Sequence, residues 1–215
     1  NPSILSKVQK GQEANKIADF GITSIIKPEN ERTLIQAKWD EQKLYNEIRK
    51  TEDEIRMNKD FETAVVFDKS GKISLDKRGA QFSVGFSKDD VDKMKDAIIT
   101  HNHPRGWSYP EKSLGRIGNS FSIEDISLSI KADASEMRAV TPNYTFVMKR
   151  PKDGWPDLDK VKEVYEKENN KLKNEMWKGI NSGIFKPERA SAIHFHILWK
   201  RVSKKMNWNY SKSKT

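Results

Sequence analysis

Two of the chain's four histidines lie one residue apart in the segment IITHNHP, residues 98–104. The β-branched residues before them are typical of a strand, and the proline after them ends strand pairing. Alternate residues of a strand point to the same face and lie about 7 Å apart. His101 and His103 would therefore present both imidazoles to one ion at the end of a strand.

A metal ion bound here would need a carboxylate as its third protein ligand, because the chain has no cysteine. Neutral imidazoles suit zinc, and a catalytic zinc site commonly combines three protein ligands with water. The candidate is Asp125, because the segment SFSIEDISLSI predicts a helix that has this residue in its first turn. Ser122 is then placed to hold the oxygen of a reacting carbonyl. Its spacing from Asp125 is equally typical of a capping box, so both interpretations stay open.

Hydrolysis at such a site also needs a carboxylate that takes a proton from water and delivers it to the leaving group. Glu62 is our candidate, because it opens the otherwise apolar strand segment ETAVVFD. The nearest upstream competitor is Glu54. A solvated strand end is the alternative explanation for an acidic residue at position 62.

These residues follow one another in an order that resembles the signature of JAMM (JAB/MPN-type) zinc metalloproteases. That signature has a glutamate, then an H-x-H-P-x-G run, then an S-x-x-D run. The matching residues here are Glu62, His101, His103, Pro104, Gly106, Ser122 and Asp125. The resemblance covers about residues 61–150. The segments THNHP, FSIEDI and EMRAVTPNYTF are also similar to JAB-like domains appended to phage Mu F-type head-morphogenesis proteins and related mobile-element proteins.

The resemblance implies an α+β (α/β) fold of the cytidine-deaminase-like type, with a curved mixed sheet flanked by helices. It implies Zn²⁺-dependent hydrolysis of a peptide or isopeptide bond in a protein or peptide substrate. His101, His103 and Asp125 would be the zinc ligands. Glu62 would be the general acid/base, and Ser122 would stabilise the oxyanion.

The segment between the two halves of the signature is longer than the family pattern. It contains Trp107 and Tyr109, which could shape a groove for an extended peptide substrate. The alternative is that both rings only pack this loop against the sheet.

Other segments with clear patterns surround the signature. ISLDKRG, AQFSVGF and both halves of EMRAVTPNYTFVMKR predict strands, and SKDDVDKMKDA predicts a helix capped by Ser87. Long polar helical patterns precede and follow them. We therefore divide the chain into an N-terminal helical extension (1–60), a JAMM-like catalytic domain (61–150) and a basic C-terminal helical region (151–215). Since the sequence begins with Asn1, we expect a processed chain or part of a longer polypeptide.

Most of the net charge of +9 falls after residue 150, and the end segment WKRVSKKMNWNYSKSKT, residues 199–215, is basic with interleaved aromatic residues. Such a pattern can bind nucleic acid through phosphate pairing and base stacking. The candidate contacts are Lys200, Arg201, Lys204 and Lys205. The alternative is the solvated face of an amphipathic helix followed by a loose tail.

A second H-x-H run, His194 and His196, falls in a helical pattern. Side chains two apart on a helix diverge by about 200°, so these histidines cannot share an ion and we predict structural roles. The adjacent letters HNH at 101–103 do not indicate a nuclease, because that motif spreads its residues over a ββα unit.

No apolar run of about 18 residues and no signal-peptide pattern occur in the sequence. We expect no membrane span, and either a cytoplasmic protein or one associated with a virion or mobile element. Three functional hypotheses remain. They are a zinc metalloprotease or isopeptidase, a catalytically silent JAB-fold module of a phage, toxin or mobile-element assembly, and a nucleic-acid-binding or nuclease domain.

Overall fold

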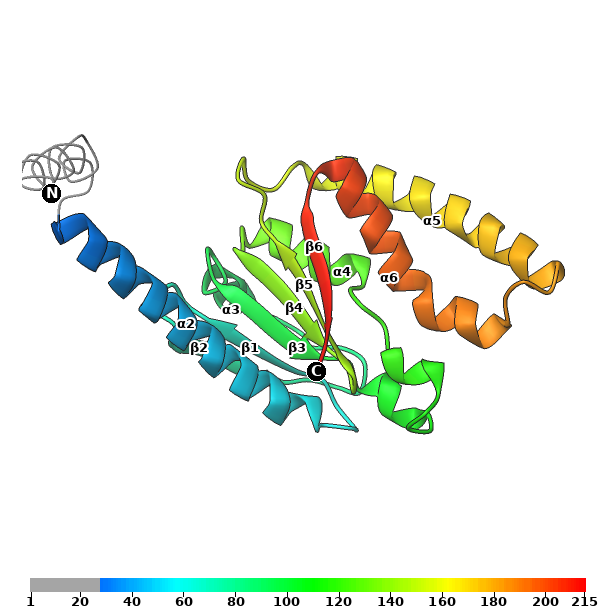
Figure 1. Cartoon of the computed structure of the whole chain (residues 1–215), viewed down its shortest axis with the longest axis horizontal. Helices are drawn as coiled ribbons and strands as arrows, with labels where there is room; N and C mark the ends of the chain where they lie inside the picture. Colours follow the sequence, from blue (N-terminus) through cyan, green and yellow to red (C-terminus); the bar gives the residue numbers. More distant parts are fainter. Residues whose placement is uncertain (1–27) are drawn as a thin grey trace, which may run out of the picture. The chain divides into compact units, whose positions relative to one another are not determined.

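The computed structural model describes residues 28–215 (Figure 1). The chain forms two units, Asn1–Asn46 and Glu47–Thr215, with the boundary inside helix α2 (Pro28–Arg56). Every residue of the predicted metal site belongs to the second unit.

The second unit is built on a six-stranded mixed sheet of order β2-β1-β3-β4-β5-β6. Only β3 and β4 run parallel; the other neighbours are antiparallel. The strands are β1 (Thr63–Phe67), β2 (Ile73–Arg78), β3 (Ile98–Asn102), β4 (Glu136–Val140), β5 (Tyr144–Lys149) and β6 (Asn209–Lys214). The expected α+β class is confirmed at this level, as a mixed sheet flanked by helices.

Helices lie on both faces of this sheet (Figure 1). Besides residues 47–56 of α2, they comprise α3 (Lys88–Asp92), α4 (Ile123–Lys131), α5 (Leu158–Asn181), α6 (Pro187–Met206) and two short 3₁₀ helices, η1 (Pro104–Ser108) and η2 (Leu114–Ile117). The main core lies between the sheet and α4, α5 and α6, where Ile99, Met137 and Phe146 pack with Ile126 and Trp199.

The opposite face of the sheet packs against residues 47–56 of α2. Ile48 is fully buried there, and Glu52 receives hydrogen bonds from Thr100 at 3.0 Å and from Arg138 at 2.5 and 3.1 Å. Arg138 also binds Glu136 at 2.5 Å. Because side chains alternate along a strand, Thr100 faces α2 while its neighbours Ile99 and His101 face the main core.

Two local predictions were wrong. The segment AQFSVGF, expected as a strand, is irregular, and several of its residues line the pocket described below. The expected loose tail is strand β6, which pairs with β5 over six residues from Asn209 to Lys214. Residues from the C-terminal region thus extend the same sheet that carries the histidines.

Candidate metal centre

Strand β3 positions the first two ligands. His101 is paired with Ala64 of β1 and Ala139 of β4. Since directly opposite residues of a sheet lie about 5 Å apart, these two small neighbours leave room for an imidazole above the sheet. His103 follows the end of β3, and its backbone N–H still donates to Val140 O at 2.8 Å. Both rings therefore start from well-fixed backbone.

Helix α4 positions Asp125 through a capping box. The Asp125 backbone N–H donates to Ser122 Oγ at 3.1 Å, and the Ser122 backbone N–H donates to Asp125 Oδ2 at 2.7 Å. The two interpretations of this pair are therefore compatible. The cap orients the carboxylate, and its oxygens remain within reach of both histidines.

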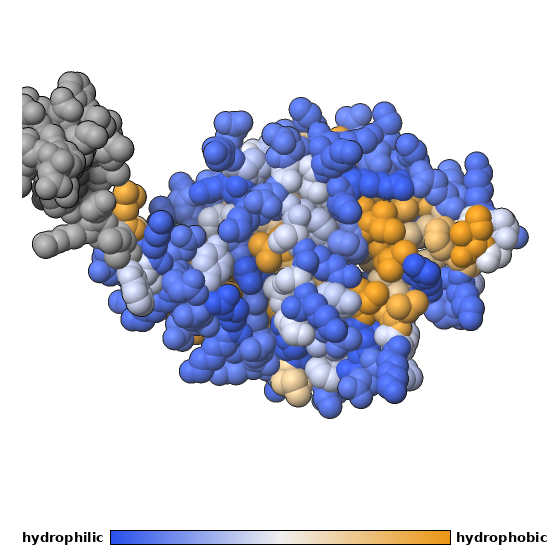
Figure 2. All heavy atoms as spheres, in the orientation of Figure 1, coloured by the Kyte–Doolittle hydropathy of each residue, from blue (hydrophilic) through white to orange (hydrophobic). Residues whose placement is uncertain are grey.

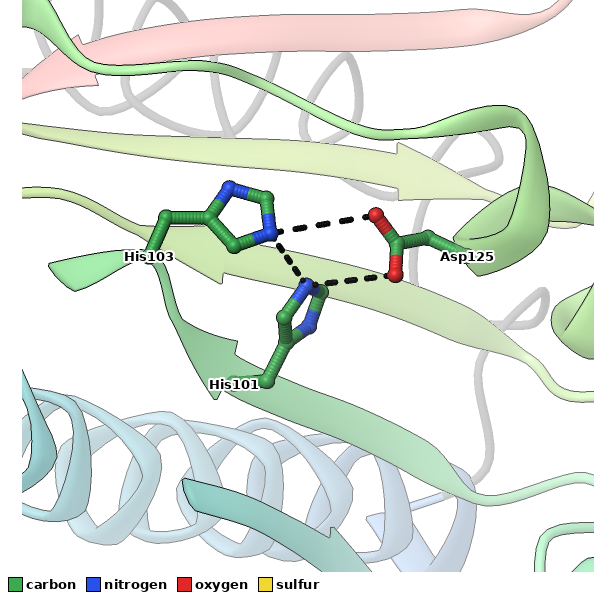
Figure 3. A group of neighbouring side chains, drawn as sticks. All are labelled: His101, His103 and Asp125. Carbon is green, nitrogen blue, oxygen red and sulfur yellow. Dashed lines mark hydrogen bonds and ion pairs between the residues drawn. The ribbon is translucent and has the colours of Figure 1, made fainter. Parts of the chain in front are cut away.

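The three side chains converge on one point (Figure 3). His101 Nε2 lies 3.0 Å from His103 Nε2 and 3.4 Å from Asp125 Oδ1, and His103 Nε2 lies 3.8 Å from Asp125 Oδ2. Tetrahedral ligands that lie 2.0–2.1 Å from a zinc ion are about 3.3 Å from one another. The observed separations bracket that value. The donor set of two imidazoles and one carboxylate thus fits a divalent transition-metal ion.

The imidazole of His103 is oriented through its other ring nitrogen. His103 Nδ1 lies 3.0 Å from the carbonyl oxygen of Asn119. That oxygen can only accept, so Nδ1 carries the proton and Nε2 keeps its lone pair. Such contacts fix the tautomer and the direction of metal-binding histidines. The backbone of Arg138 lies near His101 and contributes to raising the pKa of its imidazole.

The electrostatics of the group favour a bound cation. Burial alone lowers the pKa of His101, but the neighbouring carboxylates of Asp125 and Glu62 raise it above its usual value. Burial and the adjacent His101 hold the pKa of His103 below its usual value. Burial opposes ionisation of Asp125, yet the two histidines keep its pKa well below the ordinary range. The carboxylates around His101 thus favour positive charge at the place that a cation would take.

Glu62 lies in the same pocket as the three ligands. It directly precedes β1, and it shares a face with Ala64, the partner of His101. Its backbone bonds to Gly79 and Ala80 at 2.8 Å each. Burial raises the pKa of its carboxyl group to about 7, with opposing smaller effects of His101 and Asp125. A carboxyl group with this pKa can both accept and donate a proton near neutrality.

The pocket itself has a volume of about 430 Å³, and its lining includes Glu62, Ser122 and the three ligands. Phe82 and Phe86, from the segment expected to be a strand, form part of its wall. The alternation of apolar and polar residues in this segment predicted a strand. The same alternation occurs here in a loop, because its apolar side chains line a cavity. Glu54 is exposed on α2 and is not part of this pocket.

The loop aromatics lie outside this pocket. Trp107 Nε1 donates to Arg56 O at 2.8 Å, and the Arg116 guanidinium lies 4.6 Å from the centre of its ring. Tyr109 borders a second cavity next to the pocket. Their proposed contact with substrate stays a prediction.

The remaining candidates lie on or beside α6. Arg201 pairs with Glu175 at 2.5 Å and Lys205 with Glu168 at 2.6 Å, so acidic residues of α5 neutralise part of the basic cluster. Lys200 and Lys204 are exposed.

The two histidines of α6 have separate partners, as predicted. His194 Nε2 contacts Asn169 Oδ1 at 2.8 Å, and His196 Nδ1 contacts the Tyr210 hydroxyl at 3.0 Å.

No family model, no curated protein and no solved structure matches this chain. Within residues 28–215 no helix is long and apolar enough to cross a membrane.

Proposed function

We propose that this chain is a zinc-dependent metallohydrolase of the JAMM type that cleaves a peptide or isopeptide bond in a protein or peptide substrate. The observation that carries the proposal is the convergence of His101, His103 and Asp125 in a pocket that Glu62 also lines. The cytidine-deaminase-like variety of the fold is part of the same proposal.

His101, His103 and Asp125 would hold the ion. When bound, zinc supplies Lewis acidity, which polarises a carbonyl group and makes water acidic enough to attack it near neutral pH. Glu62 accepts a proton from the attacking water and delivers it to the leaving amine. Ser122 accepts a hydrogen bond from Asp125 through Oγ, so its own O–H is available to donate to the developing oxyanion.

Metal analysis and a glutamate substitution test the proposal together. We expect about one zinc per chain in the wild type and in Glu62→Gln, and almost none in His101→Ala. Dye-labelled unfolded protein and a lysine-linked isopeptide serve as substrates. Glu62→Gln should lower kcat by at least 10²-fold, because general acid–base catalysis contributes about 10²–10⁴.

Glu54, the exposed glutamate that is the alternative candidate for the general base, provides the matched control. Glu54→Gln should leave both zinc content and hydrolysis unchanged. Zinc binding without hydrolysis of either substrate would favour the silent assembly module. Hydrolysis that survives Glu62→Gln would assign the proton transfer to another group.

A further inference from the structure

A second cavity of about 730 Å³ lies between α5, α6 and the loop that carries η1 and η2. Its lining shares Arg105, Asn119 and Phe195 with the metal pocket. The two cavities therefore meet at these residues. We refer to the second cavity as the α5–α6 groove. Its volume falls within the range of about 300–1,000 Å³ that is usual for ligand sites.

The α5–α6 groove is largely apolar and partly open. Met176, Trp177 and Ile180 of α5 line one side, and Tyr109 of the loop lies at another. Trp177 is 64% exposed. Figure 2 shows hydrophobic residues gathered over the α5–α6 side of the molecule. Contiguous exposed apolar surface rimmed by polar residues is typical of ligand-binding grooves and interaction sites.

Two glycines show that the walls of the groove are already formed. A Cβ atom at Gly179 would lie 2.2 Å from the Phe185 ring, and one at Gly115 would lie 2.2 Å from the Tyr109 ring. The Phe185 ring packs directly on the backbone of Gly179, and the Tyr109 ring on that of Gly115. Any larger residue at either glycine would collide with the ring. The turn between α5 and α6 and the loop opposite it are thereby held in place.

The charges along the groove favour an acidic occupant. Arg105 and Lys173 contribute to its lining, and neither pairs with a carboxylate within the described residues 28–215. Glu188 is the acidic residue of the lining. Arg105 also borders the metal pocket, so a negative charge near the reacting bond would meet it first.

We propose that the α5–α6 groove binds an extended segment of the substrate polypeptide, with a large apolar side chain against Trp177 and Ile180 and an acidic residue facing Arg105 and Lys173. This inference rests on the proposed function and specifies its substrate class. An extended chain is the occupant that can contact both cavities at once, because the two cavities share Arg105, Asn119 and Phe195 in their walls. The groove selects the residues on one side of the scissile bond.

The first arm of the test uses a library of peptides from a digested proteome. Zinc-loaded wild type is incubated with the library, and the new termini are sequenced. We expect a large apolar residue and an acidic residue to be enriched at fixed positions on one side of the cleavage site. Ser191→Trp fills the groove from α6 and should reduce this enrichment about tenfold. Trp177→Ala should weaken the apolar preference.

The matched control is Trp39→Ala, which removes a tryptophan that is 69% exposed on α2 and does not line the groove. It should leave the preference as in the wild type. Zinc content is measured for every variant to verify an intact fold and metal site.

The second arm measures binding without turnover. Zinc-loaded Glu62→Gln is immobilised, and the peptides it retains from the same library are sequenced, with and without Ser191→Trp.

The outcomes separate the two proposals. Cleavage without positional preference, or with a preference that survives Ser191→Trp, overturns the groove's role in substrate binding while the proposed function stands. Retention of apolar acidic peptides that Ser191→Trp abolishes, without any cleavage by the wild type, upholds the groove's recognition and overturns the hydrolase. If the protein neither cleaves nor retains peptides, both the groove's role in substrate binding and the proposed hydrolase function are overturned. The same holds if the groove retains a small apolar dye and no peptide.

Discussion

The candidate centre combines two roles in one residue pair. Ser122 and Asp125 cap α4, and the same carboxylate faces His101 and His103. The sequence offered these roles as alternatives, because the S-x-x-D spacing satisfies both. Only the folded chain brings the capped carboxylate within reach of the imidazoles.

A matched pair of serines separates capping from catalysis. Ser87 caps α3 through the same kind of box with Asp90. Ser122→Ala and Ser87→Ala should each lower the free energy of unfolding by about 1 kcal/mol, as loss of a cap does. Only Ser122→Ala should lower kcat, by about 10²-fold or more, since it also removes an oxyanion donor. Denaturant titrations and steady-state kinetics measure the two effects.

Zinc content should stay unchanged in Ser122→Ala, because alanine keeps the backbone N–H that orients Asp125. An equal fall in kcat for both serine variants would contradict a catalytic role for Ser122.

At the level of elements, the sheet is anchored to α2 by a buried ionic group. Arg138 lies between the carboxylates of Glu52 and Glu136, and all three side chains are almost completely buried. The group lies on the face of the sheet opposite to the metal pocket, but Arg138 directly precedes Ala139, the strand partner of His101.

Arg138→Met should therefore destabilise the protein by about 3–5 kcal/mol, because it removes the guanidinium that binds the buried carboxylates of Glu52 and Glu136, and only Glu136 keeps a second cation, Lys149 at 3.5 Å. Chemical denaturation measures this change. Arg201→Ala is the control, since its partner Glu175 lies on the surface and an exposed pair contributes about 0–1 kcal/mol. Similar losses for both variants would show that burial of the Arg138 group has little energetic weight.

Much of the element order could be predicted from the sequence, for reasons of periodicity. The apolar residues of β1 and β3 form short β-branched runs, and α4 begins with its own capping signal. β6 was missed, because its sequence NYSKSK has no apolar alternation. It is an edge strand in which Tyr210 and Lys212 are partly buried while their neighbours are exposed. Backbone pairing with β5, which leaves no trace in composition, holds it in place.

The site was predictable only in part, because its supporting contacts are long-range. The ligands and Glu62 follow from motif spacing. Asn119, which accepts from His103, contributes only a backbone oxygen and therefore has no sequence signal. Phe195 reaches the pocket from α6, about 90 residues beyond the histidines, and no local pattern encodes that proximity.

For the whole molecule, a bound ion would link β3 to α4 in the folded state alone. Zinc at about 100 times its dissociation constant should raise the free energy of unfolding by about 2.7 kcal/mol near pH 8. This increment should shrink as pH falls toward 6, because zinc must displace the proton that His101, with its raised pKa, holds more firmly. Thermal unfolding with and without zinc at both pH values measures it.

Without metal, the contribution of His101 to the free energy of unfolding depends on pH in the opposite direction. Protonation of His101 stabilises the fold below its ordinary pKa of about 6.5, and that contribution is lost as pH rises through the higher folded-state pKa. His101→Ala should abolish the zinc increment, and His194→Ala should retain it. A zinc increment that does not change between pH 8 and pH 6 would show that protons and metal do not compete at this centre.

The bond from Trp199 Nε1 to Phe121 O, 2.8 Å long, has a consequence for biosynthesis. It secures the backbone just before α4 to a side chain that the ribosome adds 78 residues later. A nascent chain that already contains both histidines and the aspartate still lacks this brace. We therefore expect metal uptake to come late in synthesis, after α6 has emerged and docked, so that the growing polypeptide stays inert until then.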